Sequence, residues 1–157
     1  MEKARVKPDV TTYTTLMNAY GMNPTKAEEV LTRMEKARVK PDVTTYNTLM
    51  NAYGTNSTKA EEVLTRMKKA GVKPDVTTYT TLMNACRYHP SKAHKYFKEM
   101  LRLKIKPNIY AFNTLIVAHV SQRDTKAVEN ILEQMKTYNI EPDDVTFAVC
   151  ADTGVSL

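Results

Sequence analysis

Apolar residues recur along the chain at the spacing of an α-helix. The first group consists of Tyr13, Leu16, Met17 and Tyr20, at positions i, i+3, i+4 and i+7. The second group is similarly spaced and consists of Ala27, Val30, Leu31 and Met34. Because residues three and four apart lie on one side of a helix, each group predicts a helix with one buried face. Joined by a short polar turn, the two helices form a hairpin.

Local signals mark the ends of the predicted second helix. Asn23 and Pro24 favour a helix start, because proline in the first turn needs no backbone donor. In the next copy of the pattern, Thr58 and Glu61 have the spacing of a capping box. A Lys-Pro-Asp segment ends the helix, since proline cannot continue a helix and favours an extended residue before it.

The hairpin pattern is repeated in tandem. Lys-Pro-Asp occurs at 7–9, 40–42 and 73–75, and related tripeptides occur at 106–108 and 141–143. Successive prolines are therefore 33, 33, 33 and 35 residues apart. The predicted boundaries are 1–9 for the tail of a preceding repeat, 10–42, 43–75, 76–108 and 109–143 for four complete repeats, and 144–157 for a partial fifth repeat.

The first three repeats are two residues shorter than the fourth. We assign the difference to the turn between the helices, around residues 21–25, and expect a tighter hairpin in these repeats. Cys86 and His119 occupy the place of Tyr20 and Tyr53, and we interpret both as packing substitutions. The apolar faces of the third and fourth repeats are formed by Tyr79, Leu82, Met83, Ala93, Phe97, Met100, Phe112, Leu115, Ile116, Ala127, Leu132 and Met135.

A single hairpin cannot bury its apolar face alone, so neighbouring hairpins must stack. The pattern therefore predicts an all-α solenoid of antiparallel helical hairpins. Neither end of the chain has the polar face of a capping repeat, which indicates ends able to associate with each other.

Composition narrows the function without deciding it. Lys and Arg number 23 against 17 Asp and Glu, and the net charge of +6 with a pI near 9.2 favours a polyanionic partner. No apolar run approaches the roughly 20 residues of a membrane span. No glycine-rich phosphate loop, nucleophile motif or carboxylate pair indicates an enzyme, and no cofactor is predicted. Cys86, His89 and His94 lack the spacing of a zinc site, so no metal site is predicted.

The repeated sequence resembles the pentatricopeptide repeat. The first helix reads VTTYNTLM at residues 43–50, the second contains AEEVLTRM at residues 60–67, and the repeat ends in VKPD at residues 72–75. The resemblance is to a P-type array with shortened 33-residue repeats. It implies a right-handed α-solenoid that binds single-stranded RNA, one base per repeat. It also implies a role in organellar RNA processing, stability, editing or translation, in a mitochondrion or chloroplast.

In that family, two side chains read each base: the residue after the aromatic of the first helix, and the last residue of the repeat. The resemblance implies the pairs Thr14 with Asp42, Asn47 with Asp75, Thr80 with Asn108, and Asn113 with Asp143. A carboxylate only accepts hydrogen bonds and suits the ring N–H of guanine or uracil, whereas an amide can donate to adenine or cytosine. By the family's pattern, threonine in the first helix goes with purines and asparagine with pyrimidines. A strand running parallel to the repeats would then read 5′-GUAU-3′.

A polar stripe beside the buried face carries the reading residues. Thr11, Thr14 and Asn18 lie at i, i+3 and i+7, and would face a bound strand if the first helices line the concave side. The resemblance implies base-stacking positions at Thr11, Thr44, Thr77, Tyr110 and Val145. Lysines that recur beside the reading residues are candidates for phosphate contacts, with solvated lysines as the alternative; they are Lys7, Lys40, Lys73 and Lys106.

Two other functions are consistent with the sequence. A tetratricopeptide-like scaffold would bind a protein or peptide in the same groove, and its reading positions need not follow any base pattern. An enzyme could contain this array next to a catalytic domain that lies outside the chain.

Overall fold

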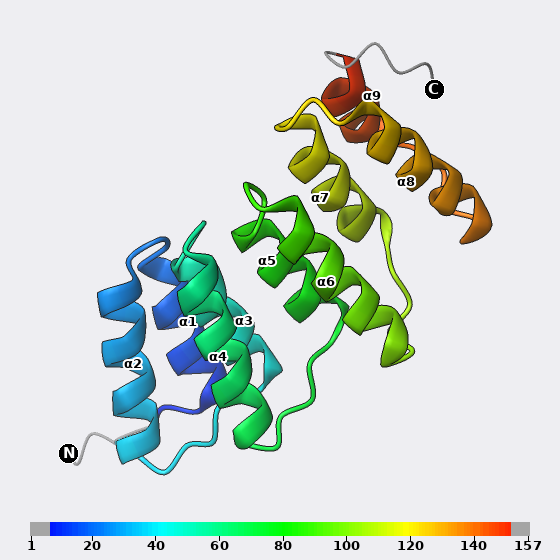
Figure 1. Ribbon diagram of the computed structural model, residues 1–157. Coiled ribbons are helices and arrows are strands. Elements are labelled where there is room, and N and C mark those ends of the chain that lie inside the picture. The colour runs from blue at the N-terminus through cyan, green and yellow to red at the C-terminus, as the bar shows by residue number, and fades with distance from the viewer. Residues whose placement is uncertain (1–6, 152–157) are drawn as a thin grey trace, which may run out of the picture.

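The computed structural model describes residues 7–151, which form helices and no strands (Figure 1). The predicted helix tail at 1–9 lies mostly outside the described residues, as does the end of the partial fifth repeat, residues 152–157. No helix between residues 7 and 151 has both the length and the apolarity to cross a membrane. The helices are α1 (Val10–Ala19), α2 (Pro24–Lys36), α3 (Val43–Ala52), α4 (Ser57–Lys69), α5 (Val76–Ala85), α6 (Pro90–Arg102), α7 (Ile109–Val120), α8 (Thr125–Thr137) and α9 (Asp144–Cys150).

The helices form two rows that run the length of the molecule (Figure 1). The first-helix row contains α1, α3, α5, α7 and α9, and each of these helices packs on the next. The second-helix row contains α2, α4, α6 and α8, each packed on the first helix of its own hairpin. Three of them, α2, α4 and α6, also pack on the first helix of the following hairpin. This is the predicted all-α solenoid of stacked hairpins, in which neighbouring repeats bury each other's apolar faces.

The core lies between the two rows and follows the predicted helix faces. Phe97 and Phe112 are almost fully buried and meet edge to face, with ring centroids 5.2 Å apart. Tyr20 differs from the prediction, because its side chain is 40% exposed. Its counterpart Tyr53 is half-buried and bonds to Glu28 of the preceding hairpin, whereas no hairpin precedes α1 within the described residues.

The turn between the helices of a hairpin has the same length in every repeat, so the predicted shortening of this turn is wrong. Four residues separate α1 from α2, and four also separate α7 from α8. The two additional residues of the fourth repeat lengthen its first helix, since α7 has 12 residues and α1, α3 and α5 have 10 each. The register of α8 shifts accordingly, and Val128 is fully buried in place of the predicted Ala127.

The start of α4 also differs from the prediction. The N-cap is Asn56, whose side chain accepts a hydrogen bond from the backbone N–H of Lys59 at 3.2 Å. The capping box predicted at Thr58 and Glu61 is therefore wrong. Asparagine is a better N-cap than threonine, and Asn56 lies two residues earlier, so the helix begins at the first position that offers a strong cap.

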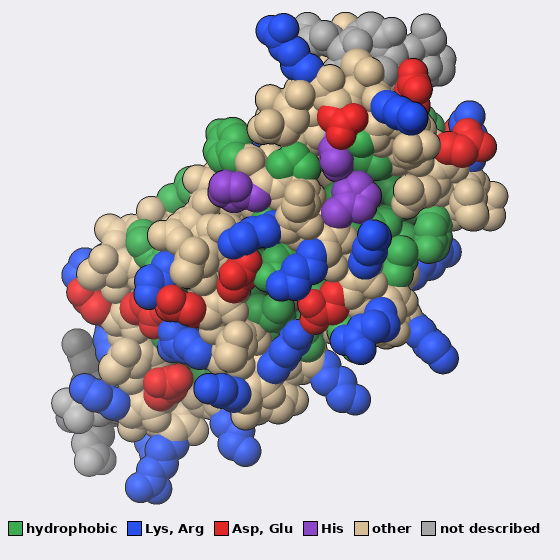
Figure 2. Space-filling view, viewed as in Figure 1, with side chains coloured by type: hydrophobic (Ala, Val, Ile, Leu, Met, Phe, Trp, Pro, Cys, Tyr) green, Lys and Arg blue, Asp and Glu red, His purple; other side chains and the backbone are tan. Residues whose placement is uncertain are grey.

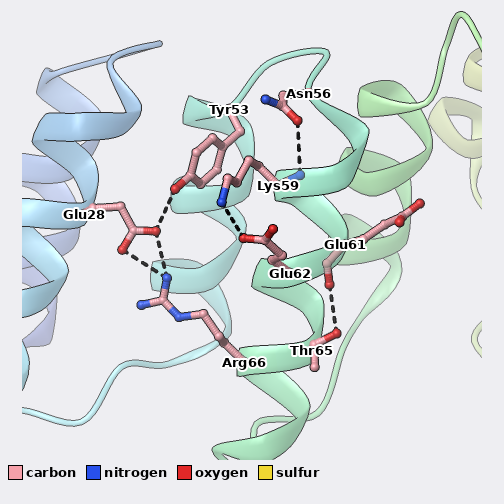
Figure 3. Close-up of polar contacts among 8 residues, drawn as sticks. All are labelled: Glu28, Tyr53, Asn56, Lys59, Glu61, Glu62, Thr65 and Arg66. Carbon is pink, nitrogen blue, oxygen red and sulfur yellow. Dashed lines mark hydrogen bonds and ion pairs between the residues drawn. The ribbon is translucent and has the colours of Figure 1, made fainter.

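Ion pairs on the second-helix row join neighbouring hairpins. Glu28 accepts hydrogen bonds from Tyr53 Oη at 2.8 Å and from Arg66 Nη1 at 2.7 and 3.0 Å (Figure 3). Burial and the Glu28 carboxylate raise the pKa of Tyr53 to about 12, so the phenol remains protonated and donates to this carboxylate. At the next interface Lys92 pairs with Glu61 at 3.1 Å. Because these charges are partly solvated, each pair contributes only about 0.5 kcal/mol.

The third interface replaces these pairs with two histidines. His94 occupies the place of Glu28 and Glu61 in its repeat. Its Nδ1 lies 3.0 Å from His119 Nε2, and His119 Nδ1 lies 3.2 Å from Asp124 Oδ2. His119 is therefore a polar link between two hairpins as well as a packing substitution.

This link is expected to make the third interface sensitive to acid. Burial lowers the pKa of His94 below 6.5, and the nearby His119 and Lys98 lower it further, against the opposing effect of Asp124. The folded protein therefore binds fewer protons at His94 than the unfolded chain does. The stability contributed by neutral His94 is present above pH 6.5 and is lost as the pH falls below it.

Thermal unfolding at pH 7.5 and pH 5 measures this effect. We expect the Tm of the wild type to fall by a few degrees more than that of His94→Gln, which cannot take up the proton. An equal fall in both proteins would contradict the role of His94.

Candidate functional site

The last residue of each complete repeat is also the N-cap of the next first helix. Asp42, Asp75, Asn108 and Asp143 cap α3, α5, α7 and α9, and each side chain accepts the backbone N–H three residues further on. Asp9 caps α1 in the same way. These caps fix one side-chain oxygen of each reading residue at the end of a repeat, relative to the helix that follows it.

At the second site the two proposed reading residues contact each other. Asn47 Nδ2 donates to Asp75 Oδ1 at 3.3 Å. Thr78, in the third position of α5, joins both residues. Its Oγ1 lies 2.8 Å from Asn47 Oδ1 and 2.9 Å from Asp75 Oδ1, and its backbone N–H donates to Asp75 Oδ1 at 2.8 Å. The three side chains form one closed network between the middle of α3 and the N-terminus of α5.

The fourth site repeats this network. Asn113 Nδ2 donates to Asp143 Oδ1 at 3.0 Å, and Thr146 Oγ1 lies 2.7 Å from Asn113 Oδ1 and 2.9 Å from Asp143 Oδ1. Hydrogen bonds from the Thr146 backbone and from the Asn113 side chain lower the pKa of Asp143. The carboxylate therefore stays ionised and can only accept hydrogen bonds.

The first site is connected through a hydroxyl bridge. Thr14 Oγ1 lies 3.0 Å from Thr45 Oγ1, which donates to Asp42 Oδ1 at 2.8 Å. Thr14 is shorter than asparagine, and among the described residues its side chain bonds to Thr45 and not to Asp42. The pair is thus linked, but indirectly.

The third site has no such link among the described residues. Thr80 Oγ1 donates to the carbonyl of Val76 in its own helix at 2.7 Å. Asn108 Oδ1 accepts the backbone N–H of Ala111 at 3.0 Å. Ala111 stands where the other sites have Thr45, Thr78 and Thr146, and it has no hydroxyl to join the two reading side chains.

Two hollows on the first-helix row lie at proposed reading positions. One, of about 290 Å³, is lined by Thr14 and Asp42 and by the stacking candidates Thr11 and Thr44. The other, of about 350 Å³, is lined by the reading residues Thr80 and Asn113 and by the exposed stacking candidates Tyr110 and Val145. In both cases one hollow is lined by a first-helix reading residue together with two successive stacking candidates. Thr77 is exposed at the equivalent place of the third repeat.

The phosphate candidates lie in the loops that lead into the first helices. Lys7, Lys40, Lys73 and Lys106 are all exposed. Figure 2 shows Lys and Arg side chains projecting along the edge where α2, α4 and α6 end. Basic residues near these helix ends also interact favourably with the helix dipole. Within residues 7–151, no three His, Cys, Asp or Glu side chains come together as metal ligands.

Sequence reasoning missed the threonines of the reading networks. Thr45, Thr78 and Thr146 are fully buried and lie outside the set of predicted site residues. A sequence signal was available, because Asp followed three residues later by Thr, directly before an aromatic, is a pattern of helix capping. The Lys-Pro-Asp segment ends one helix, as predicted, and its aspartate also caps the start of the next.

Two family models match the chain. One, described as the pentatricopeptide repeat domain, matches residues 1–56 and 95–151, and another, described as the PPR repeat family, matches residues 56–87. The chain belongs to the pentatricopeptide repeat family. The resemblance inferred from the repeated motifs is thereby confirmed. A comparison with curated protein sequences found no match.

Solved pentatricopeptide repeat structures share this fold. The protein PPR10 in complex with an 18-nt psaJ RNA element matches 95% of the chain, with a TM-score of 0.85 and 24% sequence identity. The structure of PPR10 from maize matches 94% of the chain, with a TM-score of 0.76 and 23% sequence identity. The PPR domain of Arabidopsis thaliana protein-only RNase P 1, in complex with tRNA, matches 91% of the chain and 79% of its own length, with a TM-score of 0.71 and 14% identity. The chain spans 23% and 22% of the two PPR10 chains, respectively.

Proposed function

We propose that this pentatricopeptide repeat array binds single-stranded RNA, one base per repeat, within a mitochondrion or chloroplast. The observation that carries the proposal is the repeated geometry of the reading positions. At three of the four sites, the side chain from the first helix is hydrogen-bonded, directly or through one hydroxyl, to the last residue of the repeat. Structures of related arrays in complex with RNA support the same class of ligand.

The proposed target is 5′-GUAU-3′, read by the four pairs in chain order. Carboxylates at Asp42, Asp75 and Asp143 select keto bases, and the amide of Asn108 selects an amino base. Exposed positions on either side of each reading residue hold the bases apart, and stacking on Tyr110 would contribute roughly 1–3 kcal/mol. Lysines from the loops contact the phosphates.

Titration of the whole chain against a short RNA containing GUAU, and against one with the same bases in scrambled order, tests this proposal. We expect tighter binding to GUAU by about 10-fold or more, because each mismatched base costs on the order of 1–3 kcal/mol. Equal affinity for the two RNAs would contradict base reading. Binding of a peptide with no binding of RNA would identify a scaffold instead.

The salt dependence of binding tests the phosphate contacts separately. If four lysines each neutralise one phosphate, the logarithm of the affinity falls with the logarithm of salt concentration with a slope of about −3. Lys40→Ala is expected to reduce this slope by roughly 0.7 without changing base preference. Lys59→Ala is the matched control, because Lys59 lies on the second-helix row and pairs with Glu62 at 2.7 Å. An unchanged slope in Lys40→Ala would exclude Lys40 from the phosphate contacts.

A further inference from the structure

The orientation of an asparagine amide decides what it offers to a base. Asn47 can present its oxygen or its NH₂ group toward Asp75, and the two arrangements differ by a rotation of the amide. Asp75 Oδ1 can only accept, so the group that faces it at 3.3 Å is the NH₂. The Asn47 oxygen then faces Thr78 Oγ1 at 2.8 Å.

The surroundings of the Thr78 hydroxyl make it a donor. Its oxygen already accepts the backbone N–H of Asp75 at 3.1 Å. The two other polar atoms within 3 Å of it, Asn47 Oδ1 and Asp75 Oδ1, both lack hydrogens. Its single proton is therefore shared between these two acceptors, Asn47 Oδ1 at 2.8 Å and Asp75 Oδ1 at 2.9 Å. A rotated Asn47 would place its oxygen against the carboxylate and lose the hydrogen bond from Thr78, which disfavours that arrangement.

We propose that Thr78 and Thr146 are positioning residues that hold the amides of Asn47 and Asn113 in one orientation and thereby set the preference for uracil over cytosine. The inference rests on the proposed function and deepens it. With the amide fixed, the second N–H of the asparagine and the second carboxylate oxygen form no other hydrogen bond within the described residues. Together they offer one donor beside one acceptor. Uracil presents a ring N–H beside a carbonyl oxygen and matches this pair, whereas cytosine presents a bare ring nitrogen to the carboxylate.

The third site provides a comparison within the same chain. Ala111 removes the hydroxyl, and Thr80 bonds to its own helix instead of to the reading partner Asn108. The bridging threonine is thus present at the two sites that combine asparagine with aspartate, and at the first site, but absent from the third. Asn108 caps α7 without a threonine, so the helix cap by itself does not require one.

The test is Thr78→Val, which removes the hydroxyl and keeps the shape of the side chain. Affinities are measured for RNAs containing GUAU, GCAU and GUAC. We expect the preference for U over C at the second base to fall about 10-fold, while the preference at the fourth base is unchanged. Thr78→Ser retains the hydroxyl and is expected to restore the preference. If Thr78 had only a structural role, Thr78→Val would lower the affinity for all three RNAs equally.

Thr12→Val is the matched control. The backbone N–H and the hydroxyl of Thr12 both donate to the N-cap Asp9 at 2.8 Å, as those of Thr78 do to Asp75, but Thr12 contacts no reading asparagine among the described residues. It is expected to leave base preference unchanged. Thr146→Val repeats the test at the fourth site, near the end of the described array, where loss of a cap disturbs fewer neighbours if Thr78→Val fails to fold.

The outcomes separate the inference from the function on which it rests. Suppose that the wild type prefers U at the second base and that folded Thr78→Val has the same preference. This result would overturn the positioning role of Thr78 and leave the proposed RNA reading intact. Wild-type protein that binds no RNA would overturn the proposed function itself.

Discussion

Replacing Thr14 with asparagine is expected to change the first base that the array prefers from G to U. The first site already contains Thr45 and Asp42, the counterparts of Thr78 and Asp75 at the second site. Thr45 Oγ1 lies 3.0 Å from Thr14 Oγ1 and donates to Asp42 Oδ1, as Thr78 does to Asp75. An asparagine at position 14 can therefore accept from Thr45 and donate to Asp42, and so reproduce the network of Asn47, Thr78 and Asp75.

The length of the reading side chain gives this exchange a physical basis. Asn47 reaches across to the carboxylate of Asp75, whereas Thr14 ends at the hydroxyl of Thr45. We infer that the shorter threonine leaves room for the two rings of a purine in the hollow lined by Thr14 and Asp42. Asparagine fills part of that space and favours the single ring of a pyrimidine. Asp42 remains a pure acceptor, so the preferred base stays a keto base.

Affinities for GUAU and UUAU measure the result. The wild type is expected to favour GUAU, and Thr14→Asn to favour UUAU, each by about 10-fold or more. Asn47→Thr is the reciprocal variant and is expected to change the second base from U to G. If Thr14→Asn lowered the affinity for both RNAs without altering the ratio of the two affinities, position 14 would contribute to packing and not to base reading.

The sequence predicted the fold in most respects because the core follows helical spacing. The positions of Met17, Met50 and Met83 recur at equal intervals, and all three are fully buried. The errors arose where two local signals competed. The two additional residues of the fourth repeat could extend either the turn or the helix, and the apolar run in α7 allowed the helix to continue.

The candidate site was less predictable, because hydrogen bonds between distant residues leave little trace in a single sequence. The reading positions came from family resemblance, and their contacts could not be inferred from spacing alone. Thr78 is 31 residues from Asn47, and only the stacking of α3 on α5 brings the two side chains together. Ala111 lacks the hydroxyl that would join Thr80 to Asn108, and the spacing of apolar residues gives no sign of this difference.

Replacing Asp75 with asparagine is expected to change the second preferred base from U to C. The variant retains the helix cap, because asparagine is as good an N-cap as aspartate, and Asn108 already caps α7 in this chain at 3.0 Å. What changes is the group offered to the base. A carboxylate oxygen repels the bare ring nitrogen of cytosine, whereas the NH₂ of an amide can donate to it. Asn47 is unchanged, so the proposed preference for a pyrimidine is expected to remain.

Competition between GUAU and GCAU measures this change. The wild type is expected to bind GUAU more tightly by about 10-fold or more, and Asp75→Asn to bind GCAU more tightly by about the same factor. Asn108→Asp is the reciprocal control and should change the third base from A to G. Both variants alter the net charge by one, in opposite directions, so a general electrostatic effect would strengthen one protein and weaken the other for every RNA. Inverted preferences at the altered position alone therefore distinguish base reading from charge. If Asp75→Asn kept its preference for U, the carboxylate would act only as a helix cap.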